Sequence, residues 1–401
     1  MNISKEENTM KNRREINSSR VPIYRETGFE LTNAEITSQT FESETGHERE
    51  PGRYIYSRYR NPTVVAAEEG IMQIEGSAWA LLAQSGMAAI DIALSIFQEK
   101  DDIRPWVFFS EIYGGTNSYI DSVLQARRGI EVVKYEPYNN TYDLAAIESL
   151  IAEKRPSVLY FEVISNPMLI IADAREIIKI AKRYGVYTIV DNTFSTPVLY
   201  RPLSDGADIV IHSATKYLAG HGNITAGALC GDNPELLKRA IEYRKFVGHM
   251  LSPDDAYRLT TQMQSFNLRF RQQCINASAL AIIFENNPNI DKVLYPGIDK
   301  HQTHSIASSL FGSAGYGAMI TFSFGGYDQS VKRGRRDRFI EAVSNDIKLI
   351  PTLGDSHTIL MPVEPVWGYK YPEPGMIRMS VGFEETAHLA GIIERGLSLV
   401  I

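Results

Sequence analysis

Short apolar runs alternate with amphipathic stretches of helical length between residues 77 and 231. Seven of the apolar runs have the length of β-strands and lie at residues 77–83, 106–110, 130–135, 157–163, 186–191, 208–212 and 224–230. Helix-period segments separate several of them, for example at 87–97, 143–152 and 172–184. Nearly continuous apolar strands that alternate with helices are typical of a mostly parallel sheet covered on both faces. The pattern therefore predicts one large α/β domain built on seven strands.

The pattern changes after Pro253. Residues 254–285 form a long, mostly helical stretch without a strand signal, and short strands are predicted at 318–324 and 376–381. Residues 21–60 are predicted to be extended and carry few core signals, and the first 20 residues are polar without an apolar core. The sequence thus predicts a disordered leader, an N-terminal arm that contacts a neighbouring subunit, a large domain and a smaller α+β domain, at residues 1–20, 21–60, 61–252 and 253–401.

Composition and charge exclude several classes of protein. The chain has 401 residues, 44% of them hydrophobic and 22% charged, which excludes a disordered, coiled-coil or collagen-like protein. Lys and Arg number 41 against 48 Asp and Glu, a formal net charge of −7, so the chain lacks the positive field that gathers nucleic acid or an anionic membrane. The basic run from Lys332 to Arg338 is the local exception, and we interpret it as a solvated helix face or loop.

Cysteine content and hydropathy bear on the compartment. Cys230 and Cys274 are the only cysteines in the sequence, so no disulfide framework is possible and a reducing compartment is favoured. The sequence has no run of about 18 apolar residues, the length that a transmembrane helix needs. His301 and His304 are spaced like a pair of metal ligands, but no cysteine or acidic cluster accompanies them, so no metal site is predicted. We expect a cytoplasmic protein with no membrane and no nucleic-acid partner.

Ligands of open α/β sheets bind beyond the carboxyl ends of the strands, so the residues that follow each apolar run are the first candidates for chemistry. Ser85, Gly86 and Met87 follow the first run and open a helix, where small residues expose N–H groups that bind phosphate. A plain capped helix start explains the same residues. Tyr113 precedes two glycines after the second run. An aromatic ring at this edge either stacks on a flat ligand or is buried in a tight turn.

Two ionisable residues follow later strands. Asp191 ends an otherwise apolar strand, where a carboxylate is costly unless a cation pairs with it. Lys216 follows another buried run, and partial desolvation there lowers the pKa of an ammonium group and provides the neutral amine that attacks an aldehyde. A phosphate site, a stacking ring, a buried acid and a buried lysine together fit one ligand. That ligand is pyridoxal 5′-phosphate (PLP), which has a phosphate, a flat ring with a basic nitrogen, and an aldehyde.

Five motifs add a resemblance to a known family. They occur along the chain as YSRYRNPT (56–63), SGMAAI (85–90), YGGT (113–116), VDNTFSTP (190–197) and SATKYLAGH (213–221). In order and spacing they resemble the cystathionine γ-synthase/methionine γ-lyase family, the Cys/Met-metabolism group of PLP enzymes of fold type I. The similarity begins near Pro22 and covers the rest of the chain. It implies an aspartate-aminotransferase-like α/β fold with a seven-stranded, mostly parallel sheet and a smaller α+β C-terminal domain.

The resemblance implies a role for each matching residue. Lys216 resembles the lysine that binds the cofactor covalently, and Asp191 resembles the partner of the pyridine nitrogen. Tyr113 resembles the tyrosine that stacks on the ring and acts as an acid or base near the leaving group. The residues similar to the rest of the family's cofactor site are Ser85, Gly86, Met87, Glu162, Asn166, Ser213 and Thr215. Arg378 resembles the arginine that binds the substrate α-carboxylate, and Thr352, counted with it as substrate-binding, stands where the family usually has serine.

Tyr56 and Arg58 resemble residues that reach the phosphate bound by a neighbouring subunit. The resemblance therefore implies an active site shared across a dimer, and a homotetramer built from two such dimers. It also implies γ-elimination on a sulfur-containing or O-activated homoserine-type amino acid, giving a 2-oxo acid, ammonia and a thiol. γ-Replacement, as in cystathionine γ-synthase or O-acetylhomoserine sulfhydrylase, uses the same residues and stays open, as does an aminotransferase of the same fold type.

Three departures from the family pattern leave the substrate open. Gly115 occupies the position at which methionine γ-lyases usually carry cysteine, and Asn223 replaces the acid that follows Gly-His-Gly. His357 stands where cystathionine-using members usually have glutamate, and a histidine is mostly neutral at about pH 7. The segments 220–227 and 251–256 resemble methionine γ-lyases, whereas YGGTN resembles cystathionine γ-lyases. The motifs therefore do not decide between the two substrates.

Overall fold

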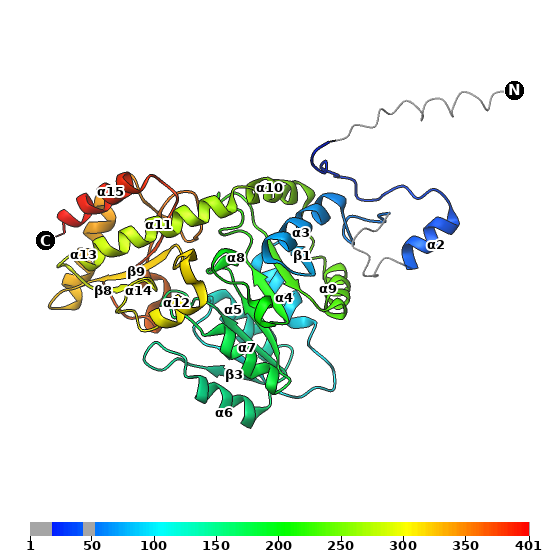
Figure 1. The fold of residues 1–401 in the computed structure, drawn as a ribbon, viewed down its shortest axis with the longest axis horizontal. Helices are drawn as coiled ribbons and strands as arrows, with labels where there is room; N and C mark the ends of the chain where they lie inside the picture. The colour runs from blue at the N-terminus through cyan, green and yellow to red at the C-terminus, as the bar shows by residue number, and fades with distance from the viewer. Residues whose placement is uncertain (1–17, 43–52, 401) are drawn as a thin grey trace.

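The computed structural model describes residues 18–42 and 53–400, and the chain is built around two β-sheets (Figure 1). The larger sheet comes from the first part of the chain and the smaller sheet from the last part. Most of the predicted leader, residues 1–17, lies outside the described residues. None of the described helices is both long enough and apolar enough to cross a membrane.

The larger sheet has the seven strands that the apolar runs predict. In their order across the sheet they are β1 (Trp79–Ala83), β7 (Gly227–Gly231), β6 (Ile209–His212), β5 (Tyr187–Asp191), β4 (Val158–Glu162), β2 (Trp106–Phe109) and β3 (Val132–Tyr135). Neighbouring strands are parallel except that β7 is antiparallel to both β1 and β6. All residues of β1, β2, β4 and β6 are buried, which explains why they appear as continuous apolar runs. The predicted fold class is confirmed, and the carboxyl ends of six strands meet at one edge.

Helices between the strands cover this sheet. α4 packs on β6 and β7, α7 packs on β5, and α3 packs on β1. The helices of this region are α3 (Pro62–Glu75), α4 (Gly86–Ser95), α5 (Gly114–Tyr119), α6 (Leu144–Lys154), α7 (Ala174–Arg183), α8 (Thr196–Leu199) and α9 (Pro234–Val247), with a π-helical turn at Ile120–Gln125 and a 3-10 turn at Pro202–Asp205. The segments predicted as helical at 87–97, 143–152 and 172–184 correspond to α4, α6 and α7.

The smaller sheet has more strands than the sequence pattern predicts. Its order is β10 (Lys348–Leu349), β11 (Ile359–Pro362), β12 (Met376–Ser380), β9 (Met319–Phe324) and β8 (Ile290–Leu294). The two predicted strands are its buried centre, β9 and β12. The other three were missed because β8 is a half-buried edge strand with two charged residues, β10 has only two exposed residues, and β11 ends on a proline. The accompanying elements are α12 (His304–Phe311), α13 (Gln329–Val343), α14 (Val363–Trp367) and α15 (Thr386–Ser398), with 3-10 turns at Gly312–Ala314 and Gly368–Lys370.

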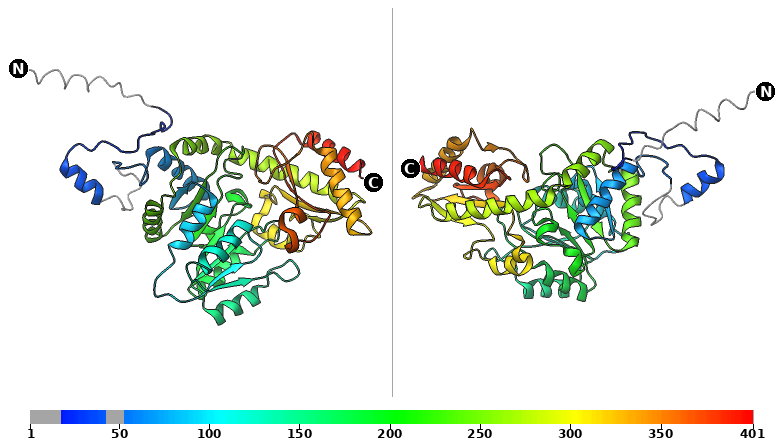
Figure 2. Two further views of the ribbon diagram at one scale, coloured as in Figure 1. Left: turned by 180° about the vertical axis from the view of Figure 1, so that it is seen from behind. Right: turned by 45° about the horizontal axis from the view of Figure 1, so that its top comes forward.

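Two helices join the two regions. The predicted helical stretch at 254–285 consists of α10 (Pro253–Met263) and α11 (Phe266–Glu285). α10 packs on α3. The first half of α11 places Phe266 and Phe270 in the core of the larger sheet, and its second half places Phe284 in the core of the smaller sheet, so α11 runs along both regions (Figures 1 and 2). The division of the chain into domains at residue 253 stays a prediction.

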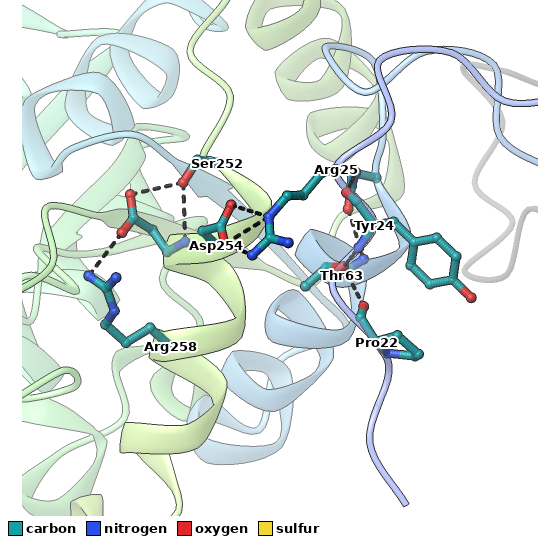
Figure 3. Close-up of polar contacts among 9 residues, drawn as sticks. Pro22, Tyr24, Arg25, Thr63, Ser252, Asp254 and Arg258 are labelled. Atoms are coloured by element: carbon teal, nitrogen blue, oxygen red, sulfur yellow. Dashed lines mark hydrogen bonds and ion pairs between the residues drawn. The ribbon is translucent and has the colours of Figure 1, made fainter. Parts of the chain in front are cut away.

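The start of the N-terminal arm is fixed on α3 and α10 by polar contacts (Figure 3). The Tyr24 N–H donates to the Thr63 hydroxyl at 2.9 Å, and that hydroxyl donates to the carbonyl of Pro22 at 2.7 Å. The Arg25 guanidinium pairs with Asp254 at 2.6 Å. Because both partners of that ion pair are exposed, solvent screens their attraction and its contribution to stability is small.

The arm contains a helix that the sequence interpretation missed. Residues 21–60 were expected to be extended, but Ala34–Glu42 forms α2. The signal was present in the sequence, because the Asn33 side chain accepts a hydrogen bond from the Ile36 N–H at 2.9 Å, as a helix N-cap does. α2 stands apart from the rest of the chain (Figures 1 and 2), and Phe41 on it is 51% exposed.

The basic run lies on α13, as a helix rather than a loop. Its side chains are nevertheless not simply solvated. Arg336 is buried, and Arg333 forms an ion pair with Glu364 at 2.5 Å. Lys332 pairs with Glu373 at 3.1 Å. The expectation of a solvated helix face is therefore wrong for Arg336, whereas Lys332 and Arg333 stay partly exposed while they pair with acids.

Candidate active site

A cavity of about 410 Å³ lies at the carboxyl edge of the larger sheet, with walls from both regions of the chain. The predicted site residues that line this cavity are Ser85, Gly86, Met87, Tyr113, Glu162, Asn166, Asp191, Ser213, Thr215, Lys216, Thr352 and Arg378. Tyr56 and Arg58 are the two predicted residues that do not line it. The structure therefore brings together residues from positions 85 to 378, which the sequence could only relate through strand ends and motifs.

Lys216 follows β6 and is partly desolvated. Its ammonium donates a hydrogen bond to the Thr352 hydroxyl at 2.8 Å. Burial, together with the positive charge of Arg378, lowers the pKa of Lys216 to about 8. The direction is the one predicted from the sequence, and at about pH 7 it leaves roughly a tenth of the lysine as free amine, far more than an ordinary lysine has.

Asp191 and Glu162 lie side by side at the ends of β5 and β4, where they are partners in the strand register. Both are buried. The Asp191 carboxyl accepts hydrogen bonds from the Thr193 N–H at 2.9 Å and from the Tyr160 hydroxyl at 3.2 Å. Burial raises the pKa of Asp191 above its usual range despite these donors. A buried acid of this kind is suited to a cationic partner, because pairing removes the cost of its charge.

Glu162 connects the acid pair to the loop that carries Tyr113. Its carboxyl accepts a hydrogen bond from the Tyr113 N–H at 2.6 Å. Burial and the neighbouring Asp191 raise the pKa of Glu162 well above its usual value. Glu162 therefore favours its neutral form and fixes the backbone at the cavity mouth.

The start of α4 forms one end of the cavity. The Ser85 side chain caps this helix by accepting from the Ala88 N–H at 3.0 Å, and the first turn of a helix leaves N–H groups without partners inside the helix. Gly86 is required here, because a Cβ on it would lie 2.9 Å from the Ser213 side chain. The Thr215 hydroxyl donates to the Ala226 carbonyl at 3.0 Å, so in this arrangement it can only accept a hydrogen bond from a ligand and cannot donate one.

Arg378 lies on β12, on the other side of the cavity. Its guanidinium donates to the Asn166 side-chain oxygen at 3.1 Å and to the Thr352 carbonyl at 2.9 Å. Its Nε is buried without a hydrogen-bond partner in the described structure. Burial lowers the pKa of Arg378 to about 10. A buried guanidinium whose contacts in the described chain are an amide and a carbonyl has a free donor edge for a carboxylate.

The residues present fit PLP and an amino-acid substrate. The buried Asp191 offers an anionic partner for a pyridine nitrogen, Lys216 offers a desolvated amine for an aldehyde, and the start of α4 offers N–H groups for a phosphate. The unpartnered Nε of Arg378 fits the α-carboxylate of an amino acid. Among the described residues no group of three or more His, Cys, Asp or Glu side chains could hold a metal ion.

Tyr113 stands half exposed at the cavity mouth. Gly115, one of the departures from the family pattern, explains its placement. A Cβ on Gly115 would contact the Tyr113 ring, with the ring Cζ only 3.0 Å away, so a larger residue would require the ring to move. The other two departures, Asn223 and His357, do not line the cavity.

Sequence reasoning missed several residues that shape the cavity. Thr193 and Tyr160 bind Asp191, and Trp367 lies over Arg378, whose guanidinium carbon is 5.4 Å from the indole centroid. Tyr160 gave no signal because it sits inside an apolar strand. Trp367 lies in a short helix without a periodic pattern, and only its contacts in the folded chain identify it.

Tyr56 and Arg58 lie on the arm side of the molecule and away from the cavity. Tyr56 is 40% exposed, and Arg58 donates to the Lys245 carbonyl at 2.5 Å. The Arg58 guanidinium also lies 4.9 Å from the centre of the Tyr59 ring. Neither residue contributes to the cavity of its own chain.

Comparison with known proteins places the chain in a family. A sequence profile of the Cys/Met metabolism PLP-dependent enzymes matches residues 4–398. The cystathionine β-lyase of Lactococcus lactis subsp. cremoris (strain MG1363) is 33% identical over 359 residues, which cover 87% of this chain and 89% of the relative. The L-methionine γ-lyase of Fusobacterium nucleatum subsp. polymorphum is 32% identical over 397 residues, which cover 95% of this chain and 93% of the relative.

The solved structure of cystathionine γ-lyase from Lactobacillus plantarum complexed with L-serine is similar, with a TM-score of 0.81. It is 29% identical, and the match covers 95% of this chain and 93% of that chain. The profile, these relatives and the constellation around Lys216 agree with one another. This chain belongs to the Cys/Met-metabolism family of PLP-dependent enzymes.

Proposed function

We propose that the protein is a γ-lyase that acts on a sulfur-containing or O-activated homoserine-type amino acid. Its products would be a 2-oxo acid, ammonia and the thiol or other leaving group. The observation that carries the proposal is the position of Lys216, whose amine is desolvated. It lines the same cavity as the buried Asp191 and as Arg378, whose Nε has no hydrogen-bond partner in the described structure. Water is the only other reactant, so methionine would give 2-oxobutyrate, ammonia and methanethiol.

The residues of the cavity divide the chemistry between them. When bound, PLP supplies an aldehyde for the substrate amino group and an electron-poor ring that stabilises negative charge at the α-carbon. Asp191 holds a positive charge on the ring nitrogen, since a buried carboxylate is stabilised by a cation. Ser85, Gly86 and Met87 hold the phosphate, and Arg378 orients the substrate by its α-carboxylate.

Two side chains move protons. Lys216 Nζ, with its pKa lowered to about 8, accepts the proton from the substrate α-carbon. A proton must also leave the β-carbon before the bond to the γ-substituent breaks. The Tyr113 hydroxyl, at the cavity mouth, is the group that gives a proton to the departing γ-substituent. Glu162 positions Tyr113 through the 2.6 Å hydrogen bond to its backbone N–H.

A substrate panel tests the reaction class. The purified PLP-loaded enzyme is incubated with methionine, cystathionine, cysteine, and O-acetyl-, O-succinyl- and O-phosphohomoserine, and 2-oxo acid, ammonia and thiol are measured. We expect 2-oxobutyrate and ammonia in equal amounts from at least one γ-substituted substrate. Lys216→Ala is the blank. A product that keeps its γ-group while the cofactor is converted to its amine form would identify an aminotransferase and contradict the proposal.

γ-Replacement is the second candidate, because the same residues serve it. The half-exposed Tyr113 marks a mouth through which a nucleophile can enter. Adding a thiol to the same panel distinguishes the two reactions. A thioether product formed at the expense of 2-oxobutyrate would assign the protein to γ-replacement, whereas an unchanged yield of 2-oxobutyrate favours the γ-lyase.

We further propose that the active site is shared between subunits of a homotetramer, with Tyr56 and Arg58 reaching the phosphate in the neighbouring subunit. Support comes from the exposure of Tyr56, from α2 standing apart from its own chain, and from Phe246, which is 75% exposed near Arg58's partner Lys245. A mixture of inactive Lys216→Ala and Arg58→Ala subunits should regain activity through hybrid dimers. No regain after demonstrated subunit exchange would contradict a shared site.

We also propose that the protein works in the cytoplasm. Cys230 and Cys274 are free and buried, and burial raises the pKa of both thiols above the usual value, which keeps them in the unreactive thiol form. Cell fractionation followed by immunoblotting tests this proposal. Recovery in a compartment outside the cytoplasm would contradict it.

A further inference from the structure

The segment from α14 to Tyr371 closes one side of the cavity with an indole ring. Trp367 and Val366, at the end of α14, line the cavity. The Arg378 guanidinium lies 5.4 Å from the indole centroid, and a Cβ on Gly114 would lie 4.0 Å from the indole Nε1. Trp367 thus spans the space between the arginine and the loop of Tyr113. A side chain that extends from a carboxylate on Arg378 toward Tyr113 must pass this ring.

This segment is anchored to the opposite domain by Glu111. The Tyr371 hydroxyl donates to the Glu111 carboxyl at 2.5 Å, and the Lys370 ammonium lies 3.2 Å from its other oxygen. Lys370 also donates to the Ser110 carbonyl at 3.0 Å. Tyr371 and Glu111 are both buried. We name these contacts the Glu111 clasp, and they hold Trp367 against the loop that carries Tyr113.

Among the described residues of this chain, the cavity lining beside Trp367 offers the far end of a substrate no charged side chain other than Arg378, which is assigned to the α-carboxylate. The ionisable side chains among the described lining residues are Tyr113, Glu162, Asp191, Lys216 and Arg378. Glu162 accepts the hydrogen bond from the Tyr113 N–H, and Asp191 is assigned to the ring nitrogen of PLP, so neither acid is available to the far end of a substrate. The remaining lining residues on the side of the smaller domain are mostly apolar: Pro351, Leu353, Met361, Val366 and Trp367.

We propose that Trp367 and Val366 select substrates whose γ-substituent is uncharged and apolar, such as the thioether of methionine or another S-alkyl homocysteine. This inference rests on the proposed γ-lyase function and names its substrate class. A substrate such as cystathionine carries a second amino-acid head group, and its charges would lose water beside Trp367 without a described partner, which is costly. An alkyl thioether instead gains contact with the indole and loses little hydration.

Amino acids that carry no leaving group test the contacts with Trp367 and Val366 by binding alone, without elimination. Norleucine, lysine and 2-aminoadipate share the α-carboxylate and α-amino group, but they end in a methyl, an ammonium and a carboxylate. Their dissociation constants for the PLP-loaded enzyme are measured by isothermal titration calorimetry. We expect norleucine to bind at least tenfold more tightly than lysine or 2-aminoadipate. Equal binding of norleucine and either charged ligand would overturn the proposal, and this comparison uses only the unaltered enzyme.

Two variants assign the selectivity to the indole. Trp367→Ala should weaken norleucine binding about tenfold and reduce its preference over lysine, while Trp367→Phe keeps most of the preference. Tyr369→Ala is the matched control, because Tyr369 lies two residues further on and is 97% exposed. We expect it to bind norleucine within twofold of the unaltered enzyme. A loss in Tyr369→Ala as large as in Trp367→Ala would mean that the segment, not the indole, determines binding.

The failure of this inference and that of the proposed function are distinguishable. If methionine gives no 2-oxobutyrate but norleucine binds selectively through Trp367, the γ-lyase proposal fails and the proposed selectivity of Trp367 and Val366 is supported. If methionine and cystathionine are both cleaved, with kcat/KM for cystathionine equal or higher, the γ-lyase proposal is supported and the proposed selectivity of Trp367 and Val366 is refuted. Preferential cleavage of methionine, lost in Trp367→Ala, supports both.

Discussion

The two sides of the cavity are built in different ways. The cofactor side comes from neighbouring strand ends of one sheet, with Glu162 and Asp191 in register on β4 and β5 and Lys216 directly after β6. The substrate side comes from segments that are distant in the sequence. Arg378 lies on β12 of the smaller sheet, and the clasp residues Lys370 and Tyr371 lie 260 residues from their partners Ser110 and Glu111.

We infer that this difference assigns the reaction to one side of the cavity and the choice of substrate to the other. The cofactor side is as rigid as the buried sheet that carries it, because its residues continue strands whose side chains are packed on both faces. The substrate side depends on the contact between the regions of the two sheets, which are held together by α11 through both cores and by the Glu111 clasp. We infer that changes on the cofactor side abolish the reaction, whereas changes on the substrate side alter which molecule reacts.

The largest effect is expected on the cofactor side, from Lys216→Ala. Removing the amine removes both the covalent attachment point and the proton acceptor, so we expect kcat to fall on the order of 10²–10⁴-fold or more. Borohydride reduction followed by mass spectrometry measures the covalent attachment of PLP. A variant that still formed the reduced adduct would contradict the assignment of Lys216.

Arg378→Lys is expected to weaken binding of the amino-acid substrate without changing the binding of PLP. Lysine keeps the charge but loses the planar pair of donors, so we expect KM for the amino acid to rise roughly tenfold to a hundredfold, with a smaller change in kcat. The visible absorption of bound PLP is the control and should not change. An equal loss in kcat with an unchanged KM would contradict a substrate-binding role.

The pH dependence of cofactor attachment reports the environment of Lys216. Its pKa is lowered to about 8 by burial and by Arg378, so the attacking free amine increases with pH up to that value. The rate of PLP attachment to the apoprotein should rise about tenfold per pH unit below about 8 and then level off. In Arg378→Met the loss of a neighbouring positive charge should shift this plateau to higher pH. A rate that keeps rising to about pH 10 in the unaltered protein would mean that the lysine is not desolvated.

The smallest effect is expected from the Glu111 clasp. Tyr371→Phe removes one hydrogen bond to a buried carboxyl, which should lower the free energy of unfolding by about 1–3 kcal/mol and reduce kcat/KM for the amino acid several-fold. Chemical denaturation and steady-state kinetics measure the two effects, with Tyr369→Phe as the exposed control. An unchanged KM in Tyr371→Phe would show that the clasp does not hold the substrate side in place.

The strand-end residues that the sequence singled out line one cavity, and they could be singled out because their signals are local. Asp191 and Lys216 were identifiable as polar residues directly after apolar strands, and Gly86 as a small residue opening a helix. Helix α2 also had a local signal in Asn33, but the arm lacks a core-facing pattern and was read as extended. Strand β8 was missed for a related reason, since a half-buried edge strand with charged residues does not alternate clearly.

The sequence by itself determined the seven-stranded sheet, because hydrophobic periodicity depends on residues close together in the chain. The residues after the strands indicated PLP, and five motifs carried the resemblance to the family. Only the tertiary structure decided the position of Trp367 over Arg378, the Glu111 clasp and the absence of His357 from the cavity lining. These features arise where the regions of the two sheets meet, and contacts between residues more than 200 positions apart leave no periodic trace in the sequence. The strand-end candidates could therefore be predicted from local pattern, while the position of Trp367 required the folded chain.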